Sequence, residues 1–289
     1  MVATIDNAYI KTFQSNVRSL AQQRTTKLRG WVDEVNEGSE EHRFDIIGEV
    51  AAQQKVGRVV ATPVLDTPWT DRVTAPAVYH AGDVVEVEDP SQMLADPNSK
   101  IANALAMSMN RQIDDIIIDA ADAAAADQDG GTTAIIGTGQ EIGAAGTVIS
   151  HDVVTEANAL FDTNDIDPDE AKIFVIGPVQ KRKLLQLMEV TSIDYQTKKA
   201  LADGYLPDYM GFSWIVSNRL NTPDASVSSY CLCFTRQAIG LHVVKDIWAQ
   251  VAMDPSISFA WRIYTALMMG AVRVEDEHMV IVRLKNAMS

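Results

Sequence analysis

The sequence predicts a mixed α+β fold, and three stretches of the chain support this class. Residues 97–126 have the periodicity of one long amphipathic helix. Residues 55–90 are rich in Val and Thr and alternate between apolar and polar positions, as half-buried strands do. Residues 229–289 consist mainly of further β-prone segments separated by turn residues.

The helix of residues 97–126 is expected to carry the elements around it. Asp96 suits the N-cap, Pro97 suits the first helical turn, and Gly130 and Gly131 end the run. At ~1.5 Å per residue the helix would span roughly 45 Å, the width of a small domain. Its buried stripe is expected to contain Ile101, Leu105, Met109, Ile113, Ile116, Ile117, Ala120 and Ala124. Its polar face is expected to contain Asn103, Asn110, Arg111, Asp114 and Asp122.

Composition restricts the class of protein. The chain has 289 residues, 47% of them hydrophobic, and is long enough to bury a sizeable core in one or two domains. A net charge of −15 disfavours a nucleic-acid reader, which needs a basic face, although a shell around nucleic acid remains compatible with it. Two cysteines cannot form a disulfide framework. No apolar run reaches membrane-spanning length, and residues 1–13 do not resemble a secretory signal.

Residues 1–50 are predicted to form an arm. Two interpretations are open, a segment that lies on acidic neighbouring subunits or an ordinary surface helix on its own domain. Residues 36–42 should be a polar break, and residues 44–54 a second short helix or turn. The apolar stripe of the arm contains Ile10, Phe13, Val17, Leu20, Ala21 and Leu28. Its basic residues are Lys11, Arg18, Arg24, Lys27 and Arg29.

Residues 58–90 are predicted to form a long hairpin with its turn at residues 66–71. Pro63, Pro68 and Pro76 exclude a central position in a sheet and suit exposed edge strands. A two-stranded hairpin is marginal in isolation, so this one needs another surface, and that surface can belong to a second chain.

The remaining segments follow in order. Residues 130–147 are glycine-rich but match no phosphate-binding pattern, so we expect a turn with a short strand. Residues 150–216 alternate helix and strand and predict one α/β module: a helix capped by Ser150, a strand over residues 173–177 and a helix opened by Pro178. Residues 229–289 are predicted to be mostly strands, including residues 258–271, which could also be read as helical.

No active site emerges from the candidate groups. Cys231 and Cys233 lie on one face of a strand without nearby partners and predict buried thiols more readily than a zinc site. The five histidines show no ligand spacing, and a nucleophile elbow is absent. An acidic cluster on the long helix could hold a divalent cation, but an acidic face paired with arginines on a neighbour explains it better. That cluster consists of Asp114, Asp115, Asp119 and Asp122.

The order of these parts resembles a tailed-bacteriophage major capsid protein of the Hong Kong 97-type fold. The resemblance rests on the arm, the proline-punctuated hairpin and, directly after it, the long helix DPNSKIANALAMSMNRQIDDIIIDAA. FVIGPVQKRKLLQL, GYLPDYMGFSWIVSN and the closing strands continue the order over essentially the whole chain. Each motif is weak alone, and the order in which the motifs follow one another makes the match specific.

The resemblance implies a structural protein without enzymatic activity, cofactor or metal. It would assemble into hexamers and pentamers of an icosahedral head around double-stranded DNA, formed in the bacterial cytoplasm, without membrane contact. Portal, scaffolding and decoration proteins are expected partners. The implied parts are an arm (1–50), an extended hairpin loop (51–90), a peripheral domain with the spine helix (91–149), an axial domain (150–243) and peripheral return strands (244–289).

Contacts between subunits are expected at residues of the arm, the hairpin and the long helix: Phe13, Arg18, Arg24, Trp69, Arg72, Tyr79, Asp115 and Asp119. Residues 58–90 contain no lysine, so the covalent cross-link of some family members is not expected. Two other classes stay open. One is an encapsulin-like compartment shell, which shares the fold, and the other is a small α/β enzyme built on residues 150–216.

Overall fold

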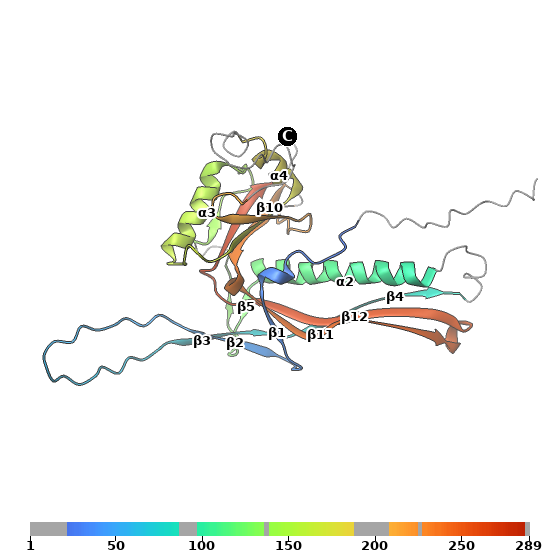
Figure 1. The fold of residues 1–289 in the computed structure, drawn as a ribbon, viewed down its shortest axis with the longest axis horizontal. Coiled ribbons are helices and arrows are strands. Elements are labelled where there is room, and N and C mark those ends of the chain that lie inside the picture. Colours follow the sequence, from blue (N-terminus) through green and yellow to red (C-terminus); the bar gives the residue numbers. More distant parts are fainter. Residues whose placement is uncertain (1–21, 87–96, 136–138, 188–207, 225–226, 287–289) are drawn as a thin grey trace, which may run out of the picture. The chain divides into compact units, whose positions relative to one another are not determined.

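The computed structural model describes residues 22–86, 97–135, 139–187, 208–224 and 227–286 (Figure 1). Within these residues the chain forms two compact units. Of the described residues, unit 1 contains 22–26, 78–86, 97–113 and 245–268, and unit 2 contains 27–77, 114–135, 139–187, 208–224, 227–244 and 269–286. The predicted α+β class is confirmed, because helices and sheets both occur in the described chain.

Unit 1 contains the first part of helix α2 (Pro97–Asp122) and a twisted strand layer. The strand order is β11 (Ile239–Asp254), β12 (Ala260–Arg273) and β4 (Ala77–Val85), of which β11 and β12 begin or end in unit 2. A short 3-10 turn, η4 (Pro255–Ile257), joins β11 to β12. The Oγ1 of Thr265 on β12 donates a hydrogen bond of 3.2 Å to the carbonyl of Ala81 on β4. Of residues 258–271, which allowed two interpretations, residues 260–271 therefore lie in the long strand β12.

Unit 2 is built around a mixed five-stranded sheet. Its strand order is β7-β13-β10-β8-β9, and β10 pairs antiparallel with both β13 and β8, whereas β9 pairs parallel with β8. An aromatic cluster fills this core: Phe174 and Trp214 stack at 4.6 Å and Phe174 meets Phe212 edge-on. The strands are β7 (Glu141–Ile142), β8 (Lys172–Ile176), β9 (Phe212–Val216), β10 (Ser228–Thr235) and β13 (Met279–Lys285).

Two helices of unit 2 confirm the predicted α/β module. Helix α3 (His151–Thr163) begins after Ser150, whose hydroxyl accepts a hydrogen bond from the amide of Val153. Four of the five predicted residues lie on its buried face, namely Val153, Val154, Ala157 and Phe161. The fifth, Leu160, is half-buried. Helix α4 (Pro178–Leu184) starts with the predicted proline but ends earlier than expected.

A second, smaller layer of unit 2 corrects the predicted hairpin. Strand β3 (Trp69–Thr74) pairs antiparallel with β2 (His42–Ile47), with Ile47 opposite Trp69, while β4 belongs to a different sheet. Residues 69–71 of the predicted turn at 66–71 therefore lie in a strand. Residues 44–54, expected to be a short helix or turn, begin in β2 instead. This sheet is completed by β5 (Ala125–Ala126) and β6 (Thr132–Thr133).

Gly240 on β11 makes room for the contact between β11 and this smaller layer. Strand β1 (Asp33–Asn36) runs parallel to the start of β11, with Asp33 opposite Gly240. The ring of Phe44 on β2 lies 2.4 Å from the place that a Cβ at Gly240 would occupy, so any other residue there would displace the ring. Phe44, Ala125 and Val272 form the buried centre of the contact.

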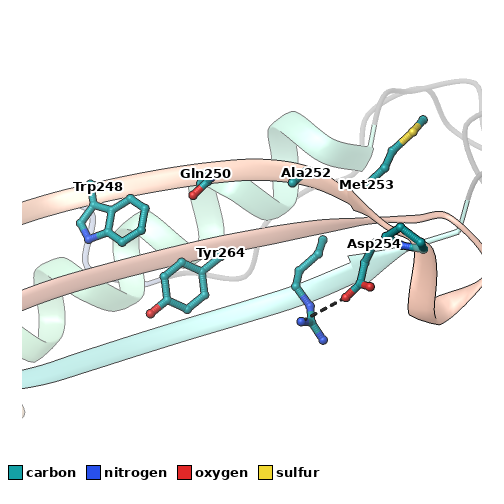
Figure 2. A pocket seen from close by; sticks show the side chains of 8 residues that line it. Trp248, Gln250, Ala252, Met253, Asp254 and Tyr264 are labelled. Carbon is teal, nitrogen blue, oxygen red and sulfur yellow. Dashed lines mark ion pairs between the residues drawn. The ribbon is translucent and has the colours of Figure 1, made fainter.

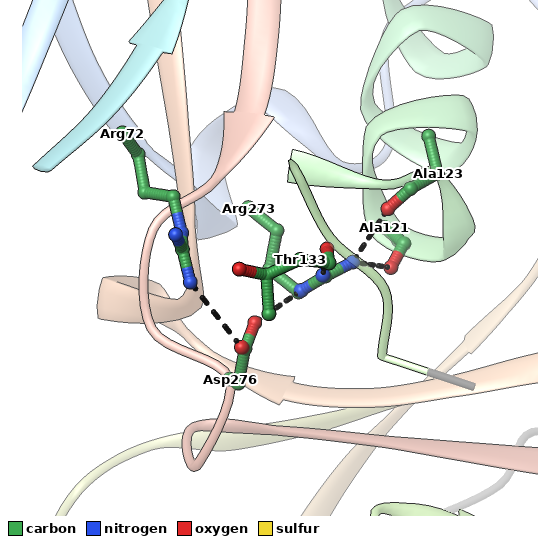
Figure 3. A network of polar contacts seen from close by, with 6 residues as sticks. All are labelled: Arg72, Ala121, Ala123, Thr133, Arg273 and Asp276. Carbon is green, nitrogen blue, oxygen red and sulfur yellow. Dashed lines mark hydrogen bonds and ion pairs between the residues drawn. The ribbon is translucent and has the colours of Figure 1, made fainter. Parts of the chain in front are cut away.

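Helix α2 ends at Asp122, four residues before the predicted end, because Arg273 captures its last carbonyl groups. Arg273 is fully buried and donates to the carbonyls of Ala121 (3.2 Å), Ala123 (2.7 Å) and Thr133 (2.6 Å) (Figure 3). The last carbonyls of a helix have no partner within it, and a cation there also complements the helix dipole. Ala125 and Ala126, predicted helical, are thereby released into β5.

The Arg273 guanidinium also forms an ion pair. Its Nε lies 2.5 Å from Oδ1 of Asp276, and Oδ2 of Asp276 accepts a hydrogen bond of 3.4 Å from Arg72 on β3 (Figure 3). One buried cation thus joins the end of α2, β6 and the loop after β12. Burying a charge costs free energy unless it is paired and hydrogen-bonded, and these bonds meet that requirement.

Replacing Arg273 with methionine should therefore lower the free energy of unfolding of the unassembled subunit by about 3–5 kcal/mol. The change leaves three carbonyls without their donor and Asp276 with Arg72 alone, while keeping most of the side-chain volume. Urea denaturation followed by circular dichroism measures the loss. Arg262→Met is the control, because the Arg262 side chain is 55% exposed, and it should change the value by less than about 0.5 kcal/mol. Equal effects of both substitutions would contradict this role for Arg273.

Candidate assembly surfaces

The connection between β2 and β3, residues 48–68, extends away from both strands of unit 2 (Figure 1). Every residue from 49 to 66 is exposed, and the side chains of Val59 and Val64 are 98% exposed. The loop also exposes Val50, Val56, Val60 and Leu65. Isolated apolar side chains are common on protein surfaces, but a contiguous series of them on a segment without a core marks a surface for association.

The observed loop changes two conclusions drawn from the sequence. It begins ten residues before the predicted hairpin at residue 58, and the added stretch includes Lys55, which is exposed. The lysine-free residues 58–90 therefore do not cover the whole loop, and the absence of a cross-link stays a prediction. The missed signal was the alternation of buried and exposed residues in β2, where Phe44 is buried between Arg43 and Asp45.

The predicted contact residues lie in different environments. Trp69 is 62% exposed at the start of β3, and Tyr79 is half-buried on β4. Arg24 is exposed, and its carbonyl accepts a hydrogen bond of 2.8 Å from Asn110 within unit 1. Arg72 is largely buried and holds Asp276 within unit 2. Phe13 and Arg18, with most of the predicted arm helix, lie outside the described residues.

Asp114 is buried, which corrects its predicted place on the polar face of the long helix. Its carboxylate accepts hydrogen bonds from the backbone amides of Lys27 (3.0 and 3.1 Å) and Leu28 (3.2 Å). Leu28 itself is fully buried, so the incoming chain is held by both polar and apolar contacts. The described residues 22–28 are not helical, and the predicted arm helix does not reach Leu28.

The other acids of the cluster have partners in unit 2. Asp115 accepts two hydrogen bonds from the guanidinium of Arg219, so its arginine lies in the same chain instead of on a neighbour. The amide of Asn221 donates to Asp119 (3.1 Å) and Asp122 (3.0 Å). Burial raises the pKa of Asp122, which the bond from Asn221 opposes. These contacts give the cluster a structural use.

Unit 1 has an open depression on its strand layer, with a volume of about 320 Å³. Trp248 on β11 and Tyr264 on β12 line it, with their ring centroids 5.4 Å apart (Figure 2). Asp254 and Arg262 form an ion pair of 3.2 Å at its end. An apolar floor with a polar edge suits an apolar segment. No periodic pattern in the sequence singles out these aromatic residues.

The candidate metal ligands do not form a site in the described part of the chain. No group of three or more His, Cys, Asp or Glu residues there is placed to hold a metal ion. Cys231 and Cys233 are fully buried, as predicted, and burial raises the pKa of the Cys231 thiol to about 12. Both cysteines thus stay protonated as packing residues. None of the described helices is long and apolar enough to cross a membrane.

Solved structures that superpose on this chain include phage capsid proteins. The chain superposes on the capsid protein of cyanophage P-SCSP1u with a TM-score of 0.76, at 18% identity over 98% of this chain and 94% of that one. The capsid protein of cyanophage Pam1 gives a TM-score of 0.75, at 11% identity over 100% and 99% of the two chains. The capsid of a native gene transfer agent (GTA) particle gives 0.73, at 12% identity over 98% of each chain.

Residues 5–286 match the family model described as phage capsid protein, and the chain therefore belongs to the phage capsid protein family. The resemblance inferred from the order of the parts is confirmed. A search of curated proteins gives no significant match. The family is one of structural proteins, which agrees with the use of the acidic cluster and the cysteines in packing.

Replacing Asp114 with alanine should lower the free energy of unfolding of the subunit by about 2–3 kcal/mol, because the buried Leu28 amide and the partly buried Lys27 amide lose their acceptor. Hydrogen exchange of the Lys27 and Leu28 amides should accelerate in the same variant. Asp119→Ala is the matched control; Asp119 is exposed, so its change should stay within about 0.5 kcal/mol. Unchanged stability and exchange in Asp114→Ala would show that the carboxylate does not hold the chain at Lys27.

Proposed function

We propose that this chain is the major capsid protein of a tailed phage and self-assembles into hexamers and pentamers of an icosahedral head. In this proposal the head encloses double-stranded DNA and has the Hong Kong 97-type arrangement, with α2 as its spine. Peripheral and axial domains follow the boundaries expected from the sequence. The family membership supports the proposal, and the exposed loop of residues 48–68 is the single observation that carries it.

The loop argues for assembly because a single subunit leaves it without a core. Fully burying one valine contributes roughly 1.5–3 kcal/mol, so several valines buried against a neighbour give a substantial contact. A contact repeated around a closed ring adds further stabilisation, since each subunit both presents its own loop and binds the loop of a neighbour. Trp69, at the base of the loop, is exposed and is proposed to join this contact.

The charge of the chain suits enclosure of DNA without sequence-specific binding. A wall with a net charge of −15 repels the phosphate backbone at most points, so packaged DNA is not held tightly against it. Portal, scaffolding and decoration proteins are proposed partners, and assembly is proposed to occur in the host bacterial cytoplasm. The family match favours a phage head over an encapsulin-like compartment.

Negative-stain electron microscopy of the purified protein tests the proposal. Uniform closed shells, with hexamers or pentamers in sedimentation velocity, would support it. A protein that stays monomeric at all concentrations, also with the scaffolding protein of the same phage, would contradict it.

Replacing Val59 and Val64 with aspartate should abolish shells while leaving the subunit folded, because both side chains are outside its core. The yield of shells should fall at least about tenfold, since buried unpaired charge costs several kcal/mol. The thermal unfolding midpoint should not change. Val148→Asp, an exposed valine of unit 2 outside the loop, is the control and should assemble normally. Normal shells from the loop variant would show that these valines stay in solvent.

The arm gives a separate prediction, and the structure determines how many residues can be removed without loss of the fold. Removing residues 1–35 would delete the buried Leu28 and much of β1, and so would damage unit 2. Removing residues 1–21 should instead leave a folded subunit that fails to close shells, because the basic arm is proposed to dock on acidic neighbours. Sedimentation and microscopy of the truncated and full chains compare them. Complete shells from the truncated chain would mean that residues 1–21 are not an assembly element.

A further inference from the structure

A basic pocket lies in unit 2 beside the edge strand of the five-stranded sheet. Its volume is about 490 Å³, and Lys27, Trp31, Lys181, Asp208 and Trp214 are among the residues that line it. The Nζ of Lys27 donates a hydrogen bond of 2.6 Å to the carbonyl of Val216 at the end of β9, which holds this amine at the pocket.

The surroundings of the pocket are positively charged in an acidic chain. Helix α4 carries Lys181, Arg182 and Lys183 in consecutive positions, and Arg182 is exposed. Of these, Lys181 lines the pocket together with Lys27 and one carboxylate, that of Asp208, while Arg182 and Lys183 follow Lys181 on α4, in a chain with 39 acidic and 24 basic residues. Such a concentration attracts an acidic partner and guides its approach.

The pocket is not built to receive an added β-strand. Tyr209 and Phe212 exchange two backbone hydrogen bonds of 3.2 Å, which occupy one end of the outer edge of β9. Lys27 occupies the carbonyl of Val216 at the other end. Recognition must therefore use the cationic side chains and the two tryptophans, and not the main chain of the strand.

An acidic surface is present elsewhere in the same unit, on the loop between α3 and β8. Asp165, Asp167 and Asp169 are exposed there, and the described residues offer them no ion pair. Helix α4 follows β8 whereas this loop precedes it, so the two charged surfaces flank opposite ends of that strand.

The acidic loop is ordered by its own hydrogen bonds. Asp165 adopts a left-handed conformation (φ 56°), and the amide of Ile166 bonds back to Phe161 at 3.2 Å, as in a helix C-cap of the Schellman type. Ile166 is buried. The amide of Glu170 closes a turn on the carbonyl of Asp167 at 3.0 Å, with proline in the second position. A surface ordered before binding loses little conformational entropy on docking.

We infer that the basic pocket of one copy receives the acidic α3–β8 loop of a second copy of this chain. The two surfaces differ, so the contact is heterologous, and repeated copies close into a ring if the rotation permits. This inference rests on the proposed self-assembly and names the charged contact that holds neighbouring subunits in register. The contact weakens as salt rises, because both surfaces are exposed.

Charge reversal on each side tests the contact in the full-length protein. Lys181→Glu/Arg182→Glu and Asp167→Lys/Asp169→Lys should each lower the assembled fraction at least about tenfold at low salt, because like charges then face each other. Combining all four substitutions should restore assembly to within about threefold of the original protein. Circular dichroism melts establish that each variant is folded. Asp129→Lys/Glu156→Lys, with the same charge change at exposed positions of unit 2, is the control.

The outcomes separate this inference from the proposed function. If the original protein assembles and both reversals assemble equally well, the charged contact is wrong and the capsid function stands. If each charge-reversal variant folds but does not assemble, and the variant with all four substitutions does not assemble either, the two surfaces do not meet. If the Lys181→Glu/Arg182→Glu variant forms normal shells that retain less DNA, the pocket contacts nucleic acid and the inference is overturned. If the original protein forms no oligomer, both proposals fall.

Discussion

The buried guanidinium of Arg273 is the interaction on which the architecture of unit 2 depends. It accounts for the end of α2, because the carbonyls of Ala121 and Ala123 bond to the cation instead of to later amides of a longer helix. The residues released by that ending form β5, which pairs with β3 at Val73 opposite Ala126. Strand β3 in turn supports one end of the exposed loop. An internal cation therefore helps to determine where an external surface begins.

Around this centre the chain divides its residues between two uses. The five-stranded sheet of unit 2 buries its aromatic residues within one subunit and is complete by itself. The loop of residues 48–68 contributes nothing to that core and exposes its valines. Polar residues show the same division: Asp114 and Asp115 are used inside the unit, while the acids of the α3–β8 loop face solvent. A subunit of this kind is folded but incomplete, as expected of a shell component.

The sequence alone predicts those elements of the fold whose position depends on one local rule. The spacing of apolar residues revealed α2, and Ser150 and Pro178 marked the starts of α3 and α4. The failures needed long-range information. Periodicity placed Asp114 on a polar face because it cannot register the amides of Lys27 and Leu28 arriving from distant sequence. The sequence predicted that the strands within residues 58–90 pair with each other. Instead β3 pairs with β2, and no turn residues in the sequence mark the ends of the loop between them. The exposure of Trp69 was anticipated, but the depression at Trp248 and Tyr264 was not.

The central claim is that the apolar residues of the loop become buried only when subunits assemble. A cryo-electron microscopy reconstruction of the assembled particle measures this most directly. The account predicts that Val59 and Val64 lose nearly all of their solvent exposure against a different subunit, while unit 2 keeps the fold described here. A closed particle in which both side chains remain in solvent, or pack on their own subunit, would contradict it.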